Sequence, residues 1–187
     1  LKKARIATIL GTYQSSLTDF VYLTKQWRSN CETERLIGVS LNGQLDCPSI
    51  RNEKTLRKMR DICVSVNDEY AKRFKINPST SITACKPEGT GSQMLNCSSG
   101  AHPRYAKYYI RRVRISSTDP LFKLMMDQGV PYSPEIGQSI DMATTFVLDF
   151  PIMSPMGAIT RHDFNAIDQL EYWKILKTNY AEHTVSM

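Results

Sequence analysis

Hydrophobic residues recur at helical spacing in two early segments of the chain. Between residues 6 and 27 they follow steps of three and four, which predicts one long helix or two short ones, although Gly11 weakens a helix by roughly 1 kcal/mol relative to Ala. Between residues 56 and 74 the stripe is continuous, with Asn52 placed to cap the first turn and Glu53 just inside it. We therefore expect a well-defined helix here, with Cys63 on its buried face. The stripe consists of Leu56, Met59, Ile62, Cys63, Val66, Tyr70 and Phe74.

Short apolar and β-branched runs alternate with these helical patterns. Residues 36–41, 79–85, 108–115 and 144–150 have the length and composition of strands, whereas residues 131–137 and 151–157 are typical of loops. One further helix is expected after Thr118, its predicted cap, and another after the near capping box of Thr160 and Asp163. This alternation predicts an α/β fold with mainly parallel strands, whose ligand sites usually lie at the carboxyl ends of the strands.

The composition is that of a folded protein. The chain has 187 residues, of which 41% are hydrophobic and 22% charged, and its mean hydropathy is −0.35. This length fits one domain or a piece of a larger one. No run approaches the roughly 18 to 20 apolar residues of a membrane helix, and the first residues lack the pattern of a signal peptide. Because the chain starts without Met and ends at Met187 on a strand-like segment, we expect a fragment.

Charge and cysteine usage restrict the possible partners and the compartment. Lys and Arg number 24 against 18 Asp and Glu, a net charge of +6 that favours anionic partners, although most of it is spread along the chain as ordinary surface charge. The five cysteines include no C-x-x-C pair, which predicts a reducing, cytoplasmic environment. The three histidines have no metal-binding spacing, so no metal site is expected from this chain alone.

The segment richest in chemistry is the run from Gly89 to Ser92, which follows a predicted strand. Its two glycines allow a tight turn and close approach of a ligand, while a helix start offers free N–H groups to phosphate. Thr90 and Ser92 add hydroxyl groups, and Lys86 adds charge. The run matches neither the Walker pattern nor the dinucleotide fingerprint. On local pattern alone, a phosphate site and a simple capped turn are equally compatible with it.

Three blocks in fixed order are similar to the catalytic chain of ribonucleotide reductases. The first comprises residues 86–93 with their continuations 98–104 and 108–114, and the others are residues 35–43 and 179–186. The resemblance is to class II, adenosylcobalamin-dependent enzymes of the ribonucleoside-triphosphate reductase type, and it spans nearly the whole chain. It implies the C-terminal part of a ten-stranded α/β barrel, truncated at both ends, with residues 1–187 as one partial barrel domain and no second domain.

The resemblance also implies a function and a site. The family replaces the ribose 2′-hydroxyl by hydrogen through thiyl-radical chemistry, an oxidoreductase reaction with a disulfide as acceptor. The matching loop, which holds the substrate phosphates, comprises Pro87, Glu88, Gly89, Thr90, Gly91 and Ser92. Glu88 and Gly91 stand where several relatives have Ser or another small residue. Because a carboxylate repels phosphate, we expect Glu88 to point away or to contact a cation.

Other parts of the family's machinery are expected outside this chain. The radical cysteine loop would lie upstream of Leu1 and the shuttle cysteines beyond Met187, so no catalytic residue is assigned here and an isolated fragment is expected to be inactive. Cys31 has the wrong spacing for the radical motif, and Cys85 and Cys97 are interpreted as packing residues. Adenosylcobalamin would bind mainly outside the segment. The implied partners are a ribonucleoside triphosphate, a dNTP effector and a thioredoxin-like reductant, without a membrane or stably bound nucleic acid.

Two alternatives remain at this point. One is a ribonucleoside-diphosphate reductase of another class. The other is a basic nucleic-acid-binding module, in which aromatic rings stack on bases beside cations. Against the second, a strand places Arg112 and Arg114 on one face and Arg111 on the other, so pairing with carboxylates is the simpler expectation. The residues of this module would be Tyr105, Tyr108, Tyr109, Arg111, Arg112 and Arg114.

Overall fold

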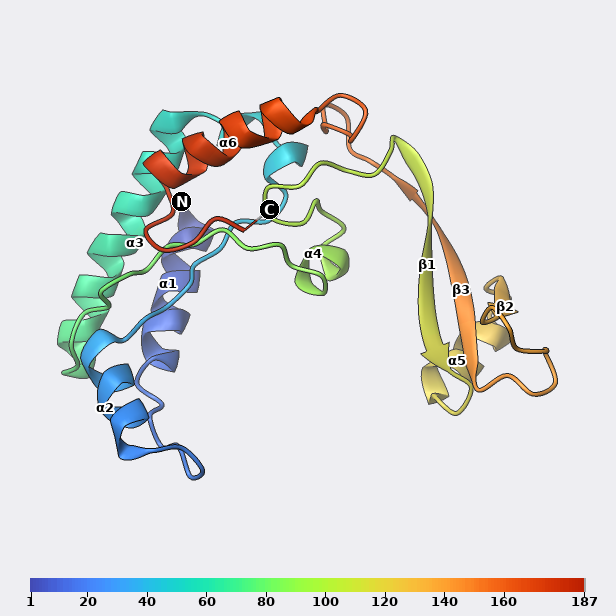
Figure 1. Cartoon of the computed structure of the whole chain (residues 1–187), viewed down its shortest axis with the longest axis horizontal. Helices are drawn as coiled ribbons and strands as arrows, with labels where there is room; N and C mark the ends of the chain where they lie inside the picture. The colour runs from blue at the N-terminus through green and yellow to red at the C-terminus, as the bar shows by residue number, and fades with distance from the viewer. Residues whose placement is uncertain (187) are drawn as a thin grey trace. The chain divides into compact units, whose positions relative to one another are not determined.

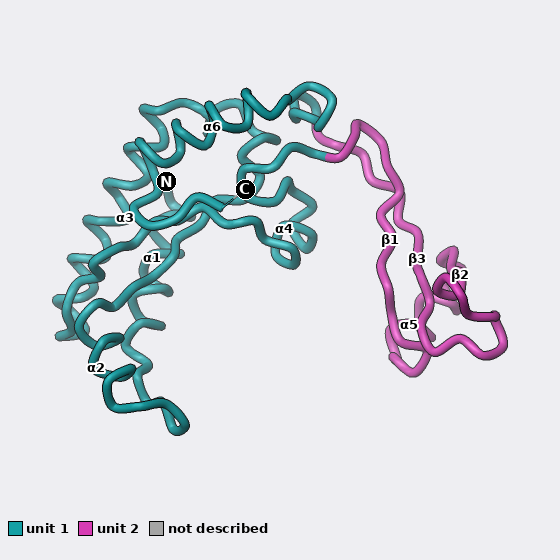
Figure 2. Tube along the Cα trace, in the orientation of Figure 1, with its two compact units in different colours: residues 1–104, 156–187 teal, residues 105–155 magenta. Residues whose placement is uncertain are grey.

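The computed structural model describes residues 1–186, which form two compact units. Unit 1 comprises residues 1–104 and 156–187, and unit 2 comprises residues 105–155 (Figure 2). We describe each unit by itself. The single partial barrel domain expected for residues 1–187 stays a prediction.

Helices account for much of unit 1 (Figure 1). The N-terminal pattern forms two helices, α1 (Lys2–Gln14) and α2 (Lys25–Glu34), with a loop between them. The long α3 (Glu53–Phe74) begins as predicted, because the Asn52 side chain accepts a hydrogen bond from the Thr55 N–H at 2.9 Å. The remaining elements are the short η1 (Gln44–Asp46), η2 (Pro48–Ile50) and α4 (Gly91–Met94), and finally α6 (Ala166–Asn179).

The cap of α6 differs from the prediction. Asn165 accepts from the backbone N–H groups of Ile167 and Asp168, and the Asp168 carboxylate accepts in return from the Asn165 N–H at 2.9 Å. This completes a capping box one turn later than expected. The predicted pair does interact, since Thr160 donates to the Asp163 carboxylate, but it closes a turn that precedes the helix.

The predicted strands at 36–41 and 79–85 are extended segments joined by isolated parallel bridges. Val39 pairs with Thr83, and Cys85 pairs with Val185 near the C-terminus. The Val39 N–H donates to the Ile82 carbonyl at 2.8 Å, and the Cys85 N–H donates to the Thr184 carbonyl at 2.8 Å. In unit 1, therefore, the parallel pairing expected from the sequence is present, but only as single bridges.

The core of unit 1 lies between α3, α6 and the extended segments. Tyr180 is fully buried and donates through its hydroxyl to the Val39 carbonyl at 2.8 Å, which joins the end of α6 to the extended segment. Leu176 and Leu56 are also fully buried. The main cluster consists of Leu45, Leu56, Met59, Cys85, Ala101, Tyr172, Leu176, Tyr180 and Ala181.

Unit 2 is a three-stranded antiparallel sheet with one helix. Strand β3 (Thr145–Met153) lies between β1 (Tyr108–Ser116) and β2 (Tyr132–Pro134), and β1 pairs with β3 along its whole length. The helix α5 (Pro120–Asp127) contributes Phe122, which stacks on Phe146 with ring centroids 4.5 Å apart. The expectation of mainly parallel strands is wrong for this sheet, because alternation of helix and strand does not fix strand direction.

Local predictions for unit 2 were wrong at three points. The cap of α5 is Asp119 instead of Thr118, because the Asp119 carboxylate accepts from the Leu121 N–H. The loop predicted at 131–137 contains β2, and the loop predicted at 151–157 begins with three residues of β3. Pro151 is tolerated in β3 because β2 pairs only as far as Leu148, so the missing N–H disrupts no ladder on that side.

No helix among residues 1–186 is long and apolar enough to cross a membrane.

We predict that Leu56→Ala lowers the free energy of unfolding by about 2–5 kcal/mol, because it leaves a cavity in the core of unit 1. The matched control is Leu170→Ala on α6, a leucine that is 61% exposed and whose loss should cost far less. Urea denaturation of the two variants measures the difference. Equal midpoints would contradict the burial of Leu56.

Candidate functional site

The predicted phosphate loop lies where a parallel extended segment ends. Cys85 forms the last bridge of that segment, and the Lys86 N–H donates to the Ser40 hydroxyl of the neighbouring segment at 3.1 Å. The chain then turns through Pro87 to Thr90 and enters α4 at Gly91 (Figure 1). The loop is therefore at the carboxyl end of the segment, as the sequence predicted.

The loop offers mainly backbone N–H groups as hydrogen-bond donors to a ligand. The N–H groups of four successive residues, Gly89 to Ser92, have no hydrogen-bond partner among residues 1–186. No side chain caps the first turn of α4, and a Cβ placed on Gly89 would meet no atom within 4 Å. The backbone is therefore open at Gly89 and exposed at Thr90, whereas Ser92 is buried, and unpartnered N–H groups in an exposed turn suit an anion.

Ser92 contributes differently from the prediction. Its side chain is fully buried, and its hydroxyl donates to the Glu88 carbonyl instead of facing outward. The Ser99 hydroxyl holds the same residue, because it accepts from the Glu88 N–H at 2.6 Å and donates to the Glu88 carbonyl at 3.0 Å. The two serines therefore fix the backbone of the loop at Glu88, and of the two predicted loop hydroxyls only that of Thr90 is exposed.

We had expected the Glu88 side chain to point away from the loop or to contact a cation. The structure shows neither. Its carboxylate accepts from the Asn42 side-chain amide and lies over Gly91. A Cβ built on Gly91 would be only 2.5 Å from Oε1 and 2.8 Å from Oε2 of Glu88. Glycine at position 91 thus leaves room for the Glu88 carboxylate, which a side chain there would displace.

A buried ion pair anchors the segment that follows the loop. The Arg104 guanidinium binds both carboxylate oxygens of Asp46, with Nε 3.0 Å from Oδ1 and Nη2 2.9 Å from Oδ2. The two side chains are only 4% and 10% exposed. Arg104 also donates to the side-chain and backbone oxygens of Asn96, and Asp46 accepts from the Ser98 N–H at 2.8 Å. These contacts hold residues 96–104 against η1.

The turn at Gly100 completes this anchor. Gly100 has a φ of +53°, and a Cβ there would lie 2.6 Å from the Lys86 carbonyl oxygen, so only glycine fits. Its N–H donates to Oδ1 of Asn42 at 2.8 Å. The sequence prediction missed Asn42, Asp46 and Arg104. Asn42 and Arg104 lie within the blocks that carry the resemblance, but their partners are 58 residues away along the chain and no local pattern connects them.

The cysteines near the loop differ in environment. Cys85 is fully buried and accepts from the Gln44 side-chain amide at 3.1 Å, and burial raises the pKa of its thiol. Burial, followed by the charge of Asp46, also raises the pKa of Cys97. Cys47 is exposed, and a hydrogen bond from Ser49 is the main cause of its lowered thiol pKa. The surroundings of Cys85 support its interpretation as a packing residue.

Two of the three arginines of β1 are paired with carboxylates of unit 2. Arg112 lies 3.4 Å from Asp149 on β3, and Arg114 lies 2.6 Å from Glu135. Both arginines point to the same face of the strand, as the sequence predicted. The structural interpretation of these charges is therefore supported.

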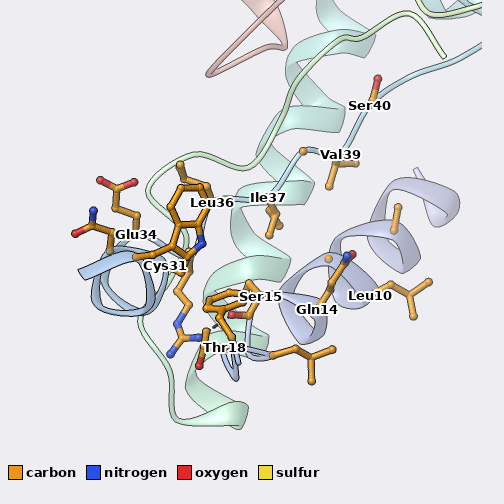
Figure 3. A pocket seen from close by; sticks show the side chains of 18 residues that line it. Leu10, Gln14, Ser15, Thr18, Cys31, Glu34, Leu36, Ile37, Val39 and Ser40 are labelled. Carbon is orange, nitrogen blue, oxygen red and sulfur yellow. Dashed lines mark hydrogen bonds between the residues drawn. The ribbon is translucent and has the colours of Figure 1, made fainter. Parts of the chain in front are cut away.

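A cavity of about 780 Å³ lies elsewhere in unit 1, between α1, α2 and the segment 35–40 (Figure 3). Its wall is mainly apolar and includes Leu10, Leu36 and Ile37. At one side the Arg35 guanidinium donates to the Ser15 carbonyl at 2.7 Å. None of the predicted site residues lines this cavity, so it plays no part in the candidate site.

The fold is that of one part of a class II ribonucleotide reductase. The structure resembles the crystal structure of a B12-dependent (class II) ribonucleotide reductase with a TM-score of 0.82, at 21% identity, over 98% of this chain and 30% of that one. The expected fold class, the α/β fold of ribonucleotide reductases, is thereby confirmed. No family model matches the chain.

More particularly, the sequence is similar to adenosylcobalamin-dependent ribonucleoside-triphosphate reductases, which confirms the resemblance seen in the motifs. A Dictyostelium discoideum protein named as a probable enzyme of this kind is 26% identical over 159 residues, which are 81% of this chain. The Lactobacillus gasseri enzyme is 31% identical over 99 residues, 53% of this chain. The chain spans only 20% and 13% of the lengths of these two relatives.

We predict that Arg104→Ala lowers the free energy of unfolding by about 3–5 kcal/mol, because it leaves the Asp46 carboxylate buried without its partner. Arg112→Ala is the control, since it breaks an exposed pair and should cost less than about 1 kcal/mol. Chemical denaturation gives both values. A small effect for Arg104→Ala would mean that the ion pair does not anchor the segment.

The cysteines should react with iodoacetamide in a fixed order at pH 7.5. Cys47 is expected to react first because it is exposed and its pKa is lowered, whereas Cys63 and Cys85 should react only after unfolding, since burial raises the pKa of each. As the pH falls from 8 to 7, the Cys47 rate should decrease less than that of free cysteine. Mass spectrometry of the labelled peptides measures the order, and early labelling of Cys85 in the folded protein would refute it.

Proposed function

We propose that this chain provides the substrate-phosphate wall of an adenosylcobalamin-dependent ribonucleoside-triphosphate reductase. The observation that carries the proposal is the row of unpartnered N–H groups from Gly89 to Ser92, at the carboxyl end of a parallel segment. The fold match and the names of the relatives support the same assignment. The phosphate groups of a ribonucleoside triphosphate are the proposed ligand.

In this proposal the backbone does most of the binding. The N–H groups of Gly89, Thr90 and Gly91 donate to phosphate oxygens, and the exposed Thr90 hydroxyl adds a further donor. The Lys86 ammonium supplies positive charge on the approach. Pro87 enters the turn, while the buried Ser92 hydroxyl positions the loop and takes no part in contact with phosphate. The Arg104–Asp46 pair and Gly100 fix the segment 96–104, which in turn holds the loop in place.

The proposed reaction of the whole protein is replacement of the ribose 2′-hydroxyl by hydrogen. When bound, adenosylcobalamin supplies the radical that starts such a reaction. As the resemblance implies, adenosylcobalamin is proposed to bind mainly outside this chain. A dNTP effector, a thioredoxin-like reductant and a cytoplasmic setting belong to the same proposal.

The nucleic-acid alternative is not favoured. Arg112 and Arg114, which it would use for phosphate contacts, form ion pairs with Asp149 and Glu135. The two relatives described above are named adenosylcobalamin-dependent ribonucleoside-triphosphate reductases, one of them as probable, and the similar crystal structure is a B12-dependent (class II) ribonucleotide reductase.

We predict that Gly89→Val raises the KM for the ribonucleoside triphosphate by roughly tenfold to a hundredfold, equivalent to about 1.4–2.8 kcal/mol, with little change in kcat. The added side chain would project into the space beside the N–H groups, where a Cβ meets no atom within 4 Å. Steady-state kinetics of the full-length enzyme provide the measurement.

Gly38→Val is the matched control. Gly38 lies in an extended segment where a Cβ would be 3.8 Å from the nearest atom, Cβ of Ala84, which is ordinary van der Waals contact and involves no residue of the loop. Its KM should equal that of the unmodified enzyme. An unchanged KM in Gly89→Val, with an unchanged melting temperature, would refute the phosphate role of the loop.

A further inference from the structure

The Glu88 carboxylate occupies the side of the loop that an incoming phosphate would approach. Its Oε1 and Oε2 lie 2.5 Å and 2.8 Å from the position a Cβ on Gly91 would take, so the carboxylate would have to move to admit any group there. Gly91 is also one of the residues whose N–H groups are unpartnered among residues 1–186. A negatively charged carboxylate therefore already lies beside the N–H groups that are proposed to bind a negatively charged phosphate.

We propose that Glu88 is a built-in competitor of the substrate, whose carboxylate must leave Gly91 before a phosphate group can bind the loop. The inference rests on the phosphate-binding function proposed above for residues 87–92. The carboxylate and a phosphate group bound at Gly91 would repel each other, so the loop cannot hold both together. An anion must therefore bind strongly enough to displace the Glu88 carboxylate before it can occupy the loop. This requirement favours a highly charged polyphosphate and makes Glu88 a specificity-determining residue.

The contacts of Glu88 allow the side chain to leave while the loop stays in place. Its backbone is fixed on both sides by the hydroxyls of Ser92 and Ser99. Its carboxylate, in contrast, is exposed and accepts from one neutral donor, the Asn42 amide. No ion pair among residues 1–186 involves Glu88. Rotation about side-chain bonds is therefore sufficient to open the loop.

The Asn42 side-chain amide can donate a hydrogen bond to either the Glu88 carboxylate or a bound phosphate. Its Oδ1 accepts from the Gly100 N–H at 2.8 Å, which orients the amide so that Nδ2 points to Glu88. When the carboxylate leaves, this N–H is released beside Gly91 and becomes free to donate to a phosphate oxygen. The same donor thus serves Glu88 in the absence of substrate and phosphate in its presence.

The test is the affinity of the full-length protein for inorganic tripolyphosphate, measured by isothermal titration calorimetry without magnesium. Glu88→Gln keeps the shape of the side chain and an oxygen that can accept from Asn42, but removes the charge. We expect it to bind tripolyphosphate about tenfold more tightly than the unmodified protein, because like-charge repulsion is lost. Glu88→Ala, a second variant, should also bind more tightly.

Glu34→Gln is the control for net charge. It makes the same change on α2, which Figure 1 shows well separated from α4, and the Glu34 side chain is exposed. Its affinity should stay within about twofold of the unmodified protein, since salt screens interactions between separated exposed charges.

The outcomes separate the two proposals. If the unmodified protein binds tripolyphosphate and both Glu88 variants bind it equally or more weakly, the competitor role is refuted while the phosphate function stands. If Glu34→Gln tightens binding as much as Glu88→Gln, the effect is one of net charge and the competitor role is again refuted. If neither the unmodified protein nor the folded variants bind, the phosphate function itself fails, and the competitor role with it.

Discussion

The buried ion pair between Arg104 and Asp46 is the interaction on which the candidate site depends. A guanidinium that is almost completely desolvated must satisfy its donors within the protein, and Arg104 does so with Asp46 and both oxygens of Asn96. Asp46 in turn binds the Ser98 N–H. This network fixes the segment behind the loop, and Ser99 and Gly100 then reach the loop backbone and Asn42. The loop can leave its own N–H groups unpartnered because contacts with residues 96–104 hold it in place.

The loop combines two opposed electrostatic features. Four unpartnered N–H groups favour an anion, whereas the Glu88 carboxylate already brings one to the same place. A carboxylate held by a single neutral amide is easier to displace than one held by a cation, because no ion pair has to be broken. The arrangement is therefore compatible with a site that is occupied by its own side chain until a ligand of higher charge arrives.

Sequence patterns predicted those features that depend on neighbours along the chain. The long α3 with its Asn52 cap, the strand at 108–115 and the place of the loop after an extended segment all follow from local spacing. Contacts between distant residues were missed, such as Arg104 with Asp46, because sequence periodicity carries no information about partners 58 residues apart. The prediction of parallel strands was wrong for unit 2 for a related reason, because strand direction there is defined by the antiparallel pairing of β1 with β3.

The role of Gly91 illustrates how structure changes an interpretation that the sequence had made reasonable. In the sequence, a glycine next to Thr90 and Ser92 indicates close approach of a ligand to the backbone. In the structure, the space over Gly91 is taken by Glu88, whereas the space over Gly89 is open. The two glycines therefore serve different purposes: Gly89 leaves room for a ligand, and Gly91 leaves room for the side chain that the ligand has to displace.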